Sequence, residues 1–239
     1  MRRPLVVTTL AVVLLTIGTP TLAATSPSSL PAGLVGKSAA QIIATSRQAT
    51  LATTSMRVTL LGSISGVSIS ESGQIGATQA SQTESYPGIA ATGSLRVIKN
   101  AVYLYANAAF LGAQLSASQT LAKRWANQWL SITPSSKYYA SYHANTTLAS
   151  ALSTVYPTSK ASVQGVVTFN GVRCVRIVGA LQTLSITTYV SATAPFLYEG
   201  DTISHTGTPG SLTMTASQWG QAFTVLAPPH ATDIATTGL

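Results

Sequence analysis

The sequence predicts an α+β fold in which a large antiparallel sheet carries its helices on one face. Two observations carry this prediction. The apolar residues keep a helical period from Ser38 to about residue 53, change to alternation, and return to a helical period only in a middle stretch. Asn170-Gly171 then stands between two strand-like runs, which is the strongest short-range hairpin signal that a sequence offers.

The first half predicts one helix followed by about five strands. Ser38 is a suitable N-cap for a helix that runs to about Thr53. The expected strands are 56–60 and 67–70, joined through 62–66, then 76–85, and a hairpin across 93–107 that turns at Lys99-Asn100. Both alternating sets of residues 76–85 are polar, so the sequence does not indicate which face of that strand is buried.

A helical insert divides the strands, and the second half is mostly strand. Within the insert we expect helices at 108–115 and 118–128, a brief extended segment at 129–132, and a helix at 145–155 that Pro157 stops. The later strands are expected at 162–169, 172–178, 184–191, 196–204, 211–217 and 221–226. Pro228-Pro229 ends the predicted sheet.

The N-terminus has the pattern of a secretory signal peptide at 1–23. Arg2 and Arg3 precede an uncharged apolar run, which small residues end before the expected cleavage after Ala23. An uncleaved N-terminal anchor is the alternative, although the run is short for a membrane span. The expected organisation is a flexible leader at 24–36, a single domain at 37–232 and a C-terminal tail at 233–239.

We therefore expect an exported protein of the periplasm, the cell envelope or the extracellular space. No cysteine lies near the cleavage point, so this chain lacks the residue that receives a lipoprotein anchor and is expected not to be lipid-anchored. Hydrophobic residues make up 46% of the chain and charged residues only 8%, which is enough apolar surface for a sizeable core. Removal of Arg2 and Arg3 lowers the formal charge from +8 to +6.

The remaining cations are scattered along the chain, which argues against a nucleic-acid partner. Their charge is interpreted as favouring solubility, with at most a weak attraction to anionic envelope material. Asn145 begins a glycosylation sequon but serves equally well as a helix N-cap. Cys174, the single cysteine, lies in a predicted strand and is interpreted as a small buried hydrophobe rather than a reactive thiol.

Enzymatic patterns are weak, and we expect no catalytic residues, no metal and no cofactor. No Gly-x-Ser-x-Gly elbow occurs, and no two histidines have the spacing of a zinc site. The one notable constellation is Glu199, Asp201 and His205, which would make a metal or acid–base site. The favoured interpretation of these residues is a solvated strand end near a Gly/Thr-rich turn.

Several segments resemble the LolA/LolB-like superfamily, and in particular the LppX/LprG class of cell-envelope lipoproteins. The segments are a helix followed by Met56-Arg57-Val58-Thr59-Leu60, the paired strands from Gly93 to Tyr105, the tryptophan-bearing stretch from Lys123 to Leu130, and the run from Asn170 through Ala194-Pro195-Phe196 to Trp219 and Pro228. Their order covers nearly all of the expected mature chain. The missing anchor cysteine departs from the class and puts membrane residence in doubt, but not the cavity.

The resemblance implies a sheet curled into a half-barrel, with helices over its concave face and an acyl-chain cavity between them. The apolar helix residues then become candidates for the lining or lid of that cavity: Leu111, Leu115, Leu121, Trp125, Leu148, Leu152, Val155 and Tyr156. The same residues fit equally well as core that plugs the sheet.

The first functional hypothesis is an exported carrier whose partner is a lipid or an acylated molecule, held in an apolar cavity. We expect a monomer that makes peripheral contacts with the membrane or envelope proteins. The alternative is an interaction or sensor module with a filled core, which binds a protein through the convex sheet or the tyrosine-rich segment 138–142. A hydrolase built on Glu199, Asp201 and His205 is the third hypothesis.

Overall fold

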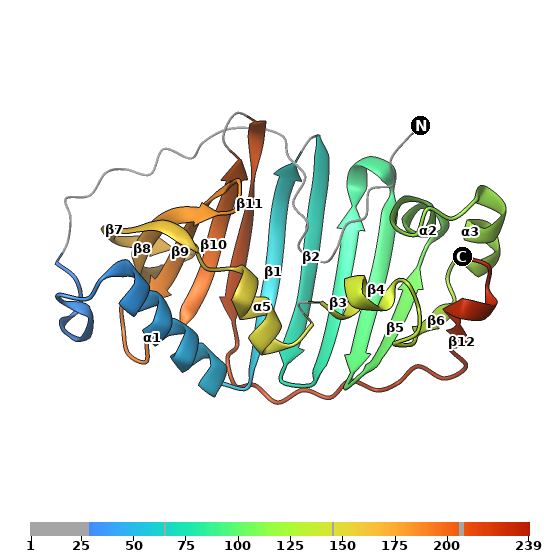
Figure 1. Ribbon diagram of the computed structural model, residues 1–239, viewed down its shortest axis with the longest axis horizontal. Helices are drawn as coiled ribbons and strands as arrows, with labels where there is room; N and C mark the ends of the chain where they lie inside the picture. Colours follow the sequence, from blue (N-terminus) through green and yellow to red (C-terminus); the bar gives the residue numbers. More distant parts are fainter. Residues whose placement is uncertain (1–28, 65, 145, 206–207) are drawn as a thin grey trace.

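The computed structural model describes residues 29–64, 66–144, 146–205 and 208–239, and one large sheet dominates them (Figure 1). Twelve strands follow the order β12-β6-β5-β4-β3-β2-β1-β11-β10-β9-β8-β7. Neighbouring strands are antiparallel except for the parallel pair β12–β6. The sheet is open, with β12 and β7 at its edges, so the predicted α+β class with a large antiparallel sheet is confirmed.

The strands, in chain order, are β1 (Ser55–Ile64), β2 (Val67–Gly76), β3 (Gln79–Tyr86), β4 (Ala91–Ile98), β5 (Ala101–Ala106), β6 (Trp129–Ile132), β7 (Ser159–Phe169), β8 (Val172–Leu181), β9 (Leu184–Ser191), β10 (Tyr198–His205), β11 (Thr208–Ser217) and β12 (Thr232–Asp233). The helices are α1 (Ala39–Ala52), α2 (Ala108–Gln114), α3 (Gln119–Trp125), α4 (Tyr139–His143) and α5 (Leu148–Thr154). Three 3-10 turns, Ala32–Leu34, Pro87–Ile89 and Ile234–Thr236, complete the elements.

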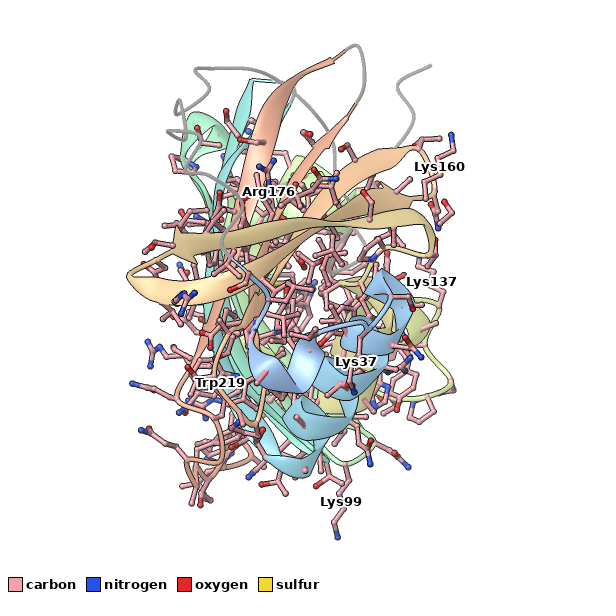
Figure 2. All side chains as sticks on the ribbon, turned by 90° about the vertical axis from the view of Figure 1, so that its left-hand side faces the viewer. Lys37, Lys99, Lys137, Lys160, Arg176 and Trp219 are labelled. Carbon is pink, nitrogen blue, oxygen red and sulfur yellow. The ribbon has the colours of Figure 1, made fainter. Side chains whose placement is uncertain are left out.

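The helices gather on one side of the sheet, and we call this side the helix-covered face. In Figure 1, α1 and α5 lie in front of one half of the sheet, while α2 and α3 lie beside β4, β5 and β6. Figure 2 shows β7 and β8 lying across the strands of the other half, so the sheet curls as a half-barrel does.

Alternation along the strands separates this face from the opposite one, the outer face. Leu95 and Val97 of β4 are buried toward the helices, whereas the intervening Ser94 and Arg96 point to the outer face. Three apolar clusters fill the space between the helices and the strands. Lysines stay at separate places on the periphery, as Figure 2 shows for Lys37, Lys99 and Lys160.

Several predicted elements form as expected for local reasons. Ser38 caps α1 in a capping box, because its hydroxyl accepts from the N–H of Gln41 while the Gln41 side chain accepts from the N–H of Ser38. The hairpin predicted at Asn170-Gly171 joins β7 to β8, with both residues at positive φ. The hairpin predicted across 93–107 is β4–β5.

The strand predicted at 221–226 is wrong. Residues 218–231 instead form an irregular connection, here called the strap, which runs along one end of the sheet to β12 (Figure 1). Side chains take the place of a ladder: the Gln79 amide donates to the carbonyl of Phe223 (2.6 Å) and accepts from the N–H of Val225 (3.1 Å). The apolar alternation of these residues therefore reflects packing of the strap rather than sheet pairing.

Two predicted boundaries and one missed helix also need correction. The link predicted at 62–66 is shorter, because β1 continues to Ile64. Gly62 lies inside β1 at a point where a Cβ would clash with the Ser211 carbonyl oxygen. The helix predicted at 145–155 begins at Leu148, where Thr147 supplies the cap; Asn145 lies outside the described residues. Helix α4 was missed because five residues carry too little periodicity to reveal it.

The segment predicted as a C-terminal tail, 233–239, packs against the molecule. Thr232–Asp233 forms β12 beside β6, and Ile234 is buried in the cluster beneath α2. The predicted signal peptide at 1–23 lies outside the described residues. Within the described part of the chain, the helices are too short or too polar to cross a bilayer.

Candidate functional site

The predicted lining residues all come from helices over the helix-covered face, but the structure sorts them into two groups. Leu111 of α2 and Leu115, which caps its C-terminal end, are buried against the inward side chains of β4 and β5. Four residues of α5 and its C-terminal end are buried against β1, β10 and β11 instead: Leu148, Leu152, Val155 and Tyr156. The predicted lining residues thus cover two halves of the sheet separately, those of α2 over one half and those of α5 over the other.

Two predicted lining residues lie at the margin. Leu121 is half-buried and belongs to neither cluster. Trp125 is half-buried against the cluster beneath α2, and its indole Nε1–H donates to the Thr237 carbonyl oxygen (3.1 Å). This bond ties α3 to the C-terminal segment, which is a structural role that the sequence did not indicate.

A small apolar hollow lies between β3–β5 and the helices α2 and α4, and we call it the inner hollow. Leu95, Leu104 and Phe110 form its apolar wall, and Glu84 and Tyr142 also border it. Its volume is about 10 Å³, which is space for about one water molecule. Ligand pockets usually measure roughly 300–1,000 Å³, so the inner hollow is closed to an acyl chain in this conformation.

Two carboxyl groups face one another beside the inner hollow. Glu71 of β2 and Glu84 of β3 are directly opposed in the ladder, and the Tyr86 hydroxyl donates to Glu84 Oε2 (3.3 Å). Burial, and then the negative charge of Glu84, raise the pKa of Glu71 to about 8. Burial also raises the pKa of Glu84, although the bond from Tyr86 opposes that shift. At neutral pH this pair therefore carries far less charge than two ordinary carboxylates.

The polar groups around this pair are incompletely satisfied. Gln82, the next inward residue of β3, is buried, and among the described residues nothing donates to its Oε1. Tyr142 reaches the site from α4, and burial raises the pKa of its hydroxyl above the ordinary tyrosine value. An apolar hollow with a few convergent polar groups is the usual composition of a small-molecule site.

On the other half of the helix-covered face, hydrogen bonds and a ring contact hold the helices to the sheet. Thr50 of α1 accepts a hydrogen bond from the Tyr198 backbone N–H (2.9 Å), and the hydroxyls of Ser46 and Tyr156 lie 3.1 Å apart. The ring of Tyr156 meets that of Tyr198 edge-on at 5.4 Å. These contacts join α1, the end of α5 and β10 into one packed unit.

Asp201 is fully buried in this unit. The Tyr198 hydroxyl donates to its Oδ2 (2.5 Å), while its Oδ1 has no partner among the described residues. Burial raises the pKa of Asp201 to about 8, against the hydrogen bond from Tyr198. Burial likewise raises the pKa of Glu199 to about 7. The expectation of a solvated strand end is therefore wrong: both residues are buried beside a bulge in β10.

Of the three residues of the predicted metal or acid–base constellation, the structure describes the side chains of Glu199 and Asp201. Asp201 is engaged by Tyr198, and the side chain of His205 lies outside what the structure describes. The described residues contain no cluster of three histidine, cysteine or acidic side chains suited to a metal ion. Cys174 is buried as predicted, and burial raises the pKa of its thiol to about 12, which suppresses the reactive thiolate.

Comparison with solved structures identifies the fold. The lipoprotein LppX of Mycobacterium tuberculosis superposes with a TM-score of 0.51 over 78% of this chain and 97% of its own, at 15% identity. LprF of Mycobacterium bovis gives a TM-score of 0.51 over 84% and 99%, at 17% identity. This chain has the LppX fold. No protein-family model and no curated protein matches the sequence.

The LppX fold confirms the resemblance inferred from the order of the sequence segments. It does not identify the ligand-binding residues, so the role of the eight predicted lining residues stays a prediction. Sequence reasoning missed Glu71, Glu84 and Tyr142 at the inner hollow. The available signal was Glu71 inside an alternating strand, but the polar alternation of the next strand concealed which face Glu84 occupies.

Proposed function

We propose that this protein is an exported, non-enzymatic carrier that holds the acyl chains of a lipid, lipoglycan or lipoprotein on its helix-covered face. The observation that carries the proposal is the inner hollow, an apolar space beneath short helices in a chain with the LppX fold. It acts as a monomer in the periplasm, the cell envelope or outside the cell, without a lipid anchor. Peripheral contacts with the membrane or with envelope proteins would deliver the lipid.

Opening of the inner hollow requires one of its covering helices to move, and α4 is the natural candidate. A helix of five residues is unstable in isolation, and α4 lacks a side-chain N-cap. The bonds at its two ends include one from the Tyr138 hydroxyl to the Leu115 carbonyl oxygen (3.2 Å), and His143 Nε2 lies 3.3 Å from the carbonyl oxygen of Lys99. By contrast, Asn107 fixes the start of α2 through bonds to Phe110, Thr92 and Ala90.

The driving force for uptake is burial of the acyl chain. At about 0.8 kcal/mol per methylene, a chain of about 16 carbons gains roughly 10 kcal/mol or more, before the cost of displacing α4. The Glu71–Glu84 pair does not oppose this burial at neutral pH, since the raised pKa of Glu71 keeps much of that group protonated. A hydroxyl group of the lipid, which can donate a hydrogen bond, is then a suitable partner for the unpaired Gln82 Oε1.

A second function, a protein-interaction or sensor module with a filled core, is favoured by one specific observation. The inner hollow measures only about 10 Å³, and the residues of α5 are already packed against the sheet. In that case the core is filled, and the protein binds a protein partner without taking up lipid.

Native mass spectrometry of protein purified from its secreting host distinguishes the two functions. A recurring adduct of lipid mass that organic extraction removes supports the carrier and identifies the class of lipid. A bare polypeptide mass, with no uptake of added lipid by the extracted and refolded protein, supports the interaction module.

Variants that fill the hollow locate the lipid. Leu104→Trp places a larger side chain in the wall of the inner hollow, and we expect at least a tenfold weaker uptake of a fluorescent fatty acid. Leu61→Trp, at a half-exposed leucine of β1, is the matched control and should leave uptake unchanged. Leu152→Trp tests whether the acyl chain extends beneath α5. Circular dichroism confirms the fold of each variant; normal uptake by a folded Leu104→Trp protein contradicts the assignment.

A further inference from the structure

A second hollow lies on the outer face, over β2 to β5, and is much larger than the inner one. We call it the outer hollow; its volume is about 310 Å³. The side chains that line it are mainly hydroxyl-bearing: Ser70, Ser72, Thr83, Ser85, Thr92 and Ser94. Its size is at the lower end of the range for small-molecule sites, so it suits a ligand of about one ring.

The two hollows lie back to back at Gly93. Glu84, Gly93 and Ser94 border both, and on the helix-covered side the Phe110 ring packs so closely that a Cβ at Gly93 would lie 2.7 Å from it. Backbone alone therefore separates the hollows at this point, and the absence of a side chain at Gly93 brings the Phe110 ring up to the sheet.

The hydroxyl groups of the outer hollow are arranged by the ladder. Ser70 opposes Ser85, and Ser85 opposes Thr92, so hydroxyls recur across strands at a separation of about 4.8 Å. The hydroxyls of Ser72 and Thr83 bond to one another at 3.1 Å. In the described part of the chain, no residue bonds to the hydroxyls of Ser70, Ser85 or Ser94, which leaves these groups free to bind a ligand.

An aromatic wall closes one side. Tyr105 borders the outer hollow, its ring centroid lies 5.3 Å from that of Trp129, and the Arg96 guanidinium covers Trp129 at 4.6 Å. Arg96 also donates to the Leu226 carbonyl oxygen (3.1 Å), so the strap helps to hold the stack. Because Arg96 holds Trp129 in place, the contact with Trp129 limits rotation of the Tyr105 ring.

No ionic side chain is directed into the outer hollow from the residues that border it. Glu84 is the only charged residue among them, and its carboxyl group turns to the other face, where it accepts from Tyr86. Asn107 and Asn127 border it too, and the Asn107 amide is already used in capping α2. The residues that border the hollow offer no cation to a phosphate, sulfate or carboxylate, and Arg96 is engaged with Trp129 and the Leu226 carbonyl oxygen, so the lining favours a neutral ligand.

We infer that the outer hollow is a carbohydrate-binding site that takes a neutral pyranose ring. The apolar C–H face of such a ring stacks on Tyr105, while its hydroxyls exchange hydrogen bonds with Ser70, Ser85, Ser94 and the Asn127 amide. The sugar belongs either to a soluble or polymeric glycan or to the headgroup of a glycolipid. This inference does not depend on acyl binding, because Ser70, Ser85 and Tyr105 border the outer hollow and not the inner one.

The test is saturation-transfer NMR and calorimetric titration of the full mature chain with methyl glucoside, methyl galactoside and methyl mannoside. We expect millimolar binding of at least one of these and at least a tenfold loss in Tyr105→Ala. Tyr105→Phe keeps the ring and should retain binding within about threefold. Tyr103→Ala removes a tyrosine from the same face and strand, away from the lining, and is the matched control.

Ser94→Leu gives a second, independent way to block the hollow, since a leucine there projects into it. A trisaccharide and vesicles containing a glucosyl diacylglycerol separate the two sources of the sugar. Tighter binding of the trisaccharide assigns a glycan, and tighter binding of the vesicles assigns a glycolipid headgroup. Absence of saturable binding to every glycoside, or equal binding by the folded Tyr105→Ala and Tyr103→Ala variants, overturns the inference.

Discussion

The inner and outer hollows occupy the same place on opposite sides of one sheet, and they differ in almost every property. The inner hollow is walled by Leu95, Leu104 and Phe110 and has a volume of about 10 Å³, whereas the outer one is lined by hydroxyls and measures about 310 Å³. Alternation along β4 and β5 produces both, because each strand presents its leucines to the helices and its serine or tyrosine to the other side.

The difference teaches that the two faces respond differently to perturbation. The helix-covered face carries the apolar burial that stabilises the fold, and also the buried carboxyl groups. Over β2 to β5, the described side chains of the outer face belong to none of the three apolar clusters and include no buried carboxyl group, so they can change with little effect on folding. The predictions below use this contrast, from the largest expected effect to the smallest.

Neighbouring residues of β5 give the sharpest contrast. Leu104 is almost fully buried on the helix-covered face, so Leu104→Ala should lower the free energy of unfolding by about 2–5 kcal/mol. Tyr105 is 36% exposed on the outer face, and Tyr105→Ala should cost about 1 kcal/mol or less. Urea denaturation of both variants measures the difference. Equal losses would show that the outer face contributes as much to folding as the inner one.

Stability should fall as pH rises from about 4 to about 8. The pKa of Glu71 and that of Asp201 are each raised to about 8 in the folded state, from ordinary values near 4. The folded state therefore holds protons that the unfolded state has already released, and its advantage is complete below about pH 4 and lost through pH 8. Each group contributes on the order of a few kcal/mol.

Glu71→Gln and Asp201→Asn locate this effect. Either substitution removes one titrating group, so each should flatten the dependence of unfolding free energy on pH, measured by denaturation at pH 4, 6 and 8. Asp233, which caps the last 3-10 turn at the surface, supplies the control in Asp233→Asn. An unchanged slope in Glu71→Gln would mean that Glu71 is not buried as the structure shows.

Gly93→Ala should have an intermediate effect that is confined to one hollow. The added Cβ would lie 2.7 Å from Phe110 Cε2, and the ring must shift within a packed cluster. We expect a loss of about 1–3 kcal/mol in unfolding free energy and altered fatty-acid uptake, with glycoside binding unchanged. Parallel titrations with a fatty acid and a methyl glycoside test this; a loss of glycoside binding alone would reverse the assignment of the faces.

The smallest effect is expected on the outer face. Ser72→Ala removes a hydroxyl that bonds to Thr83 in an accessible position, and its change in unfolding free energy should stay within about 0.5 kcal/mol. Thermal denaturation against the wild-type protein measures it. A loss above about 2 kcal/mol would show that the hydroxyl ladder is part of the structural core.

Much of this fold can be predicted from sequence, because its signals are local. The cap at Ser38, the turn at Asn170-Gly171 and the alternation of β4 and β5 each specify their own element. The prediction of a strand at 221–226 failed because the apolar alternation there has a different cause. Gln79 and Arg96, which are distant in sequence, hold the strap by hydrogen bonds to its carbonyl oxygens. The five residues of α4 carry too short a pattern for any periodic argument.

The candidate sites were harder to predict, because they depend on how the elements meet. The eight predicted lining residues are apolar helix residues, but sequence could not show that α2 and α5 roof separate halves of the sheet. The pairing of Glu71 with Glu84 requires the register of β2 and β3, which polar residues on both faces left undetermined. The outer hollow depends on four strands lying in order, so no single segment indicates it.

Photolabelling with a diazirine-bearing palmitate, followed by peptide mapping, tests the central claim most directly. If the helix-covered face takes up an acyl chain beside α4, the label will concentrate on the peptides that contain Leu95, Leu104, Phe110 and Tyr142, and unlabelled palmitate will compete it away. Label spread over the outer face, or labelling no greater than that of the heat-unfolded protein, would contradict the carrier function.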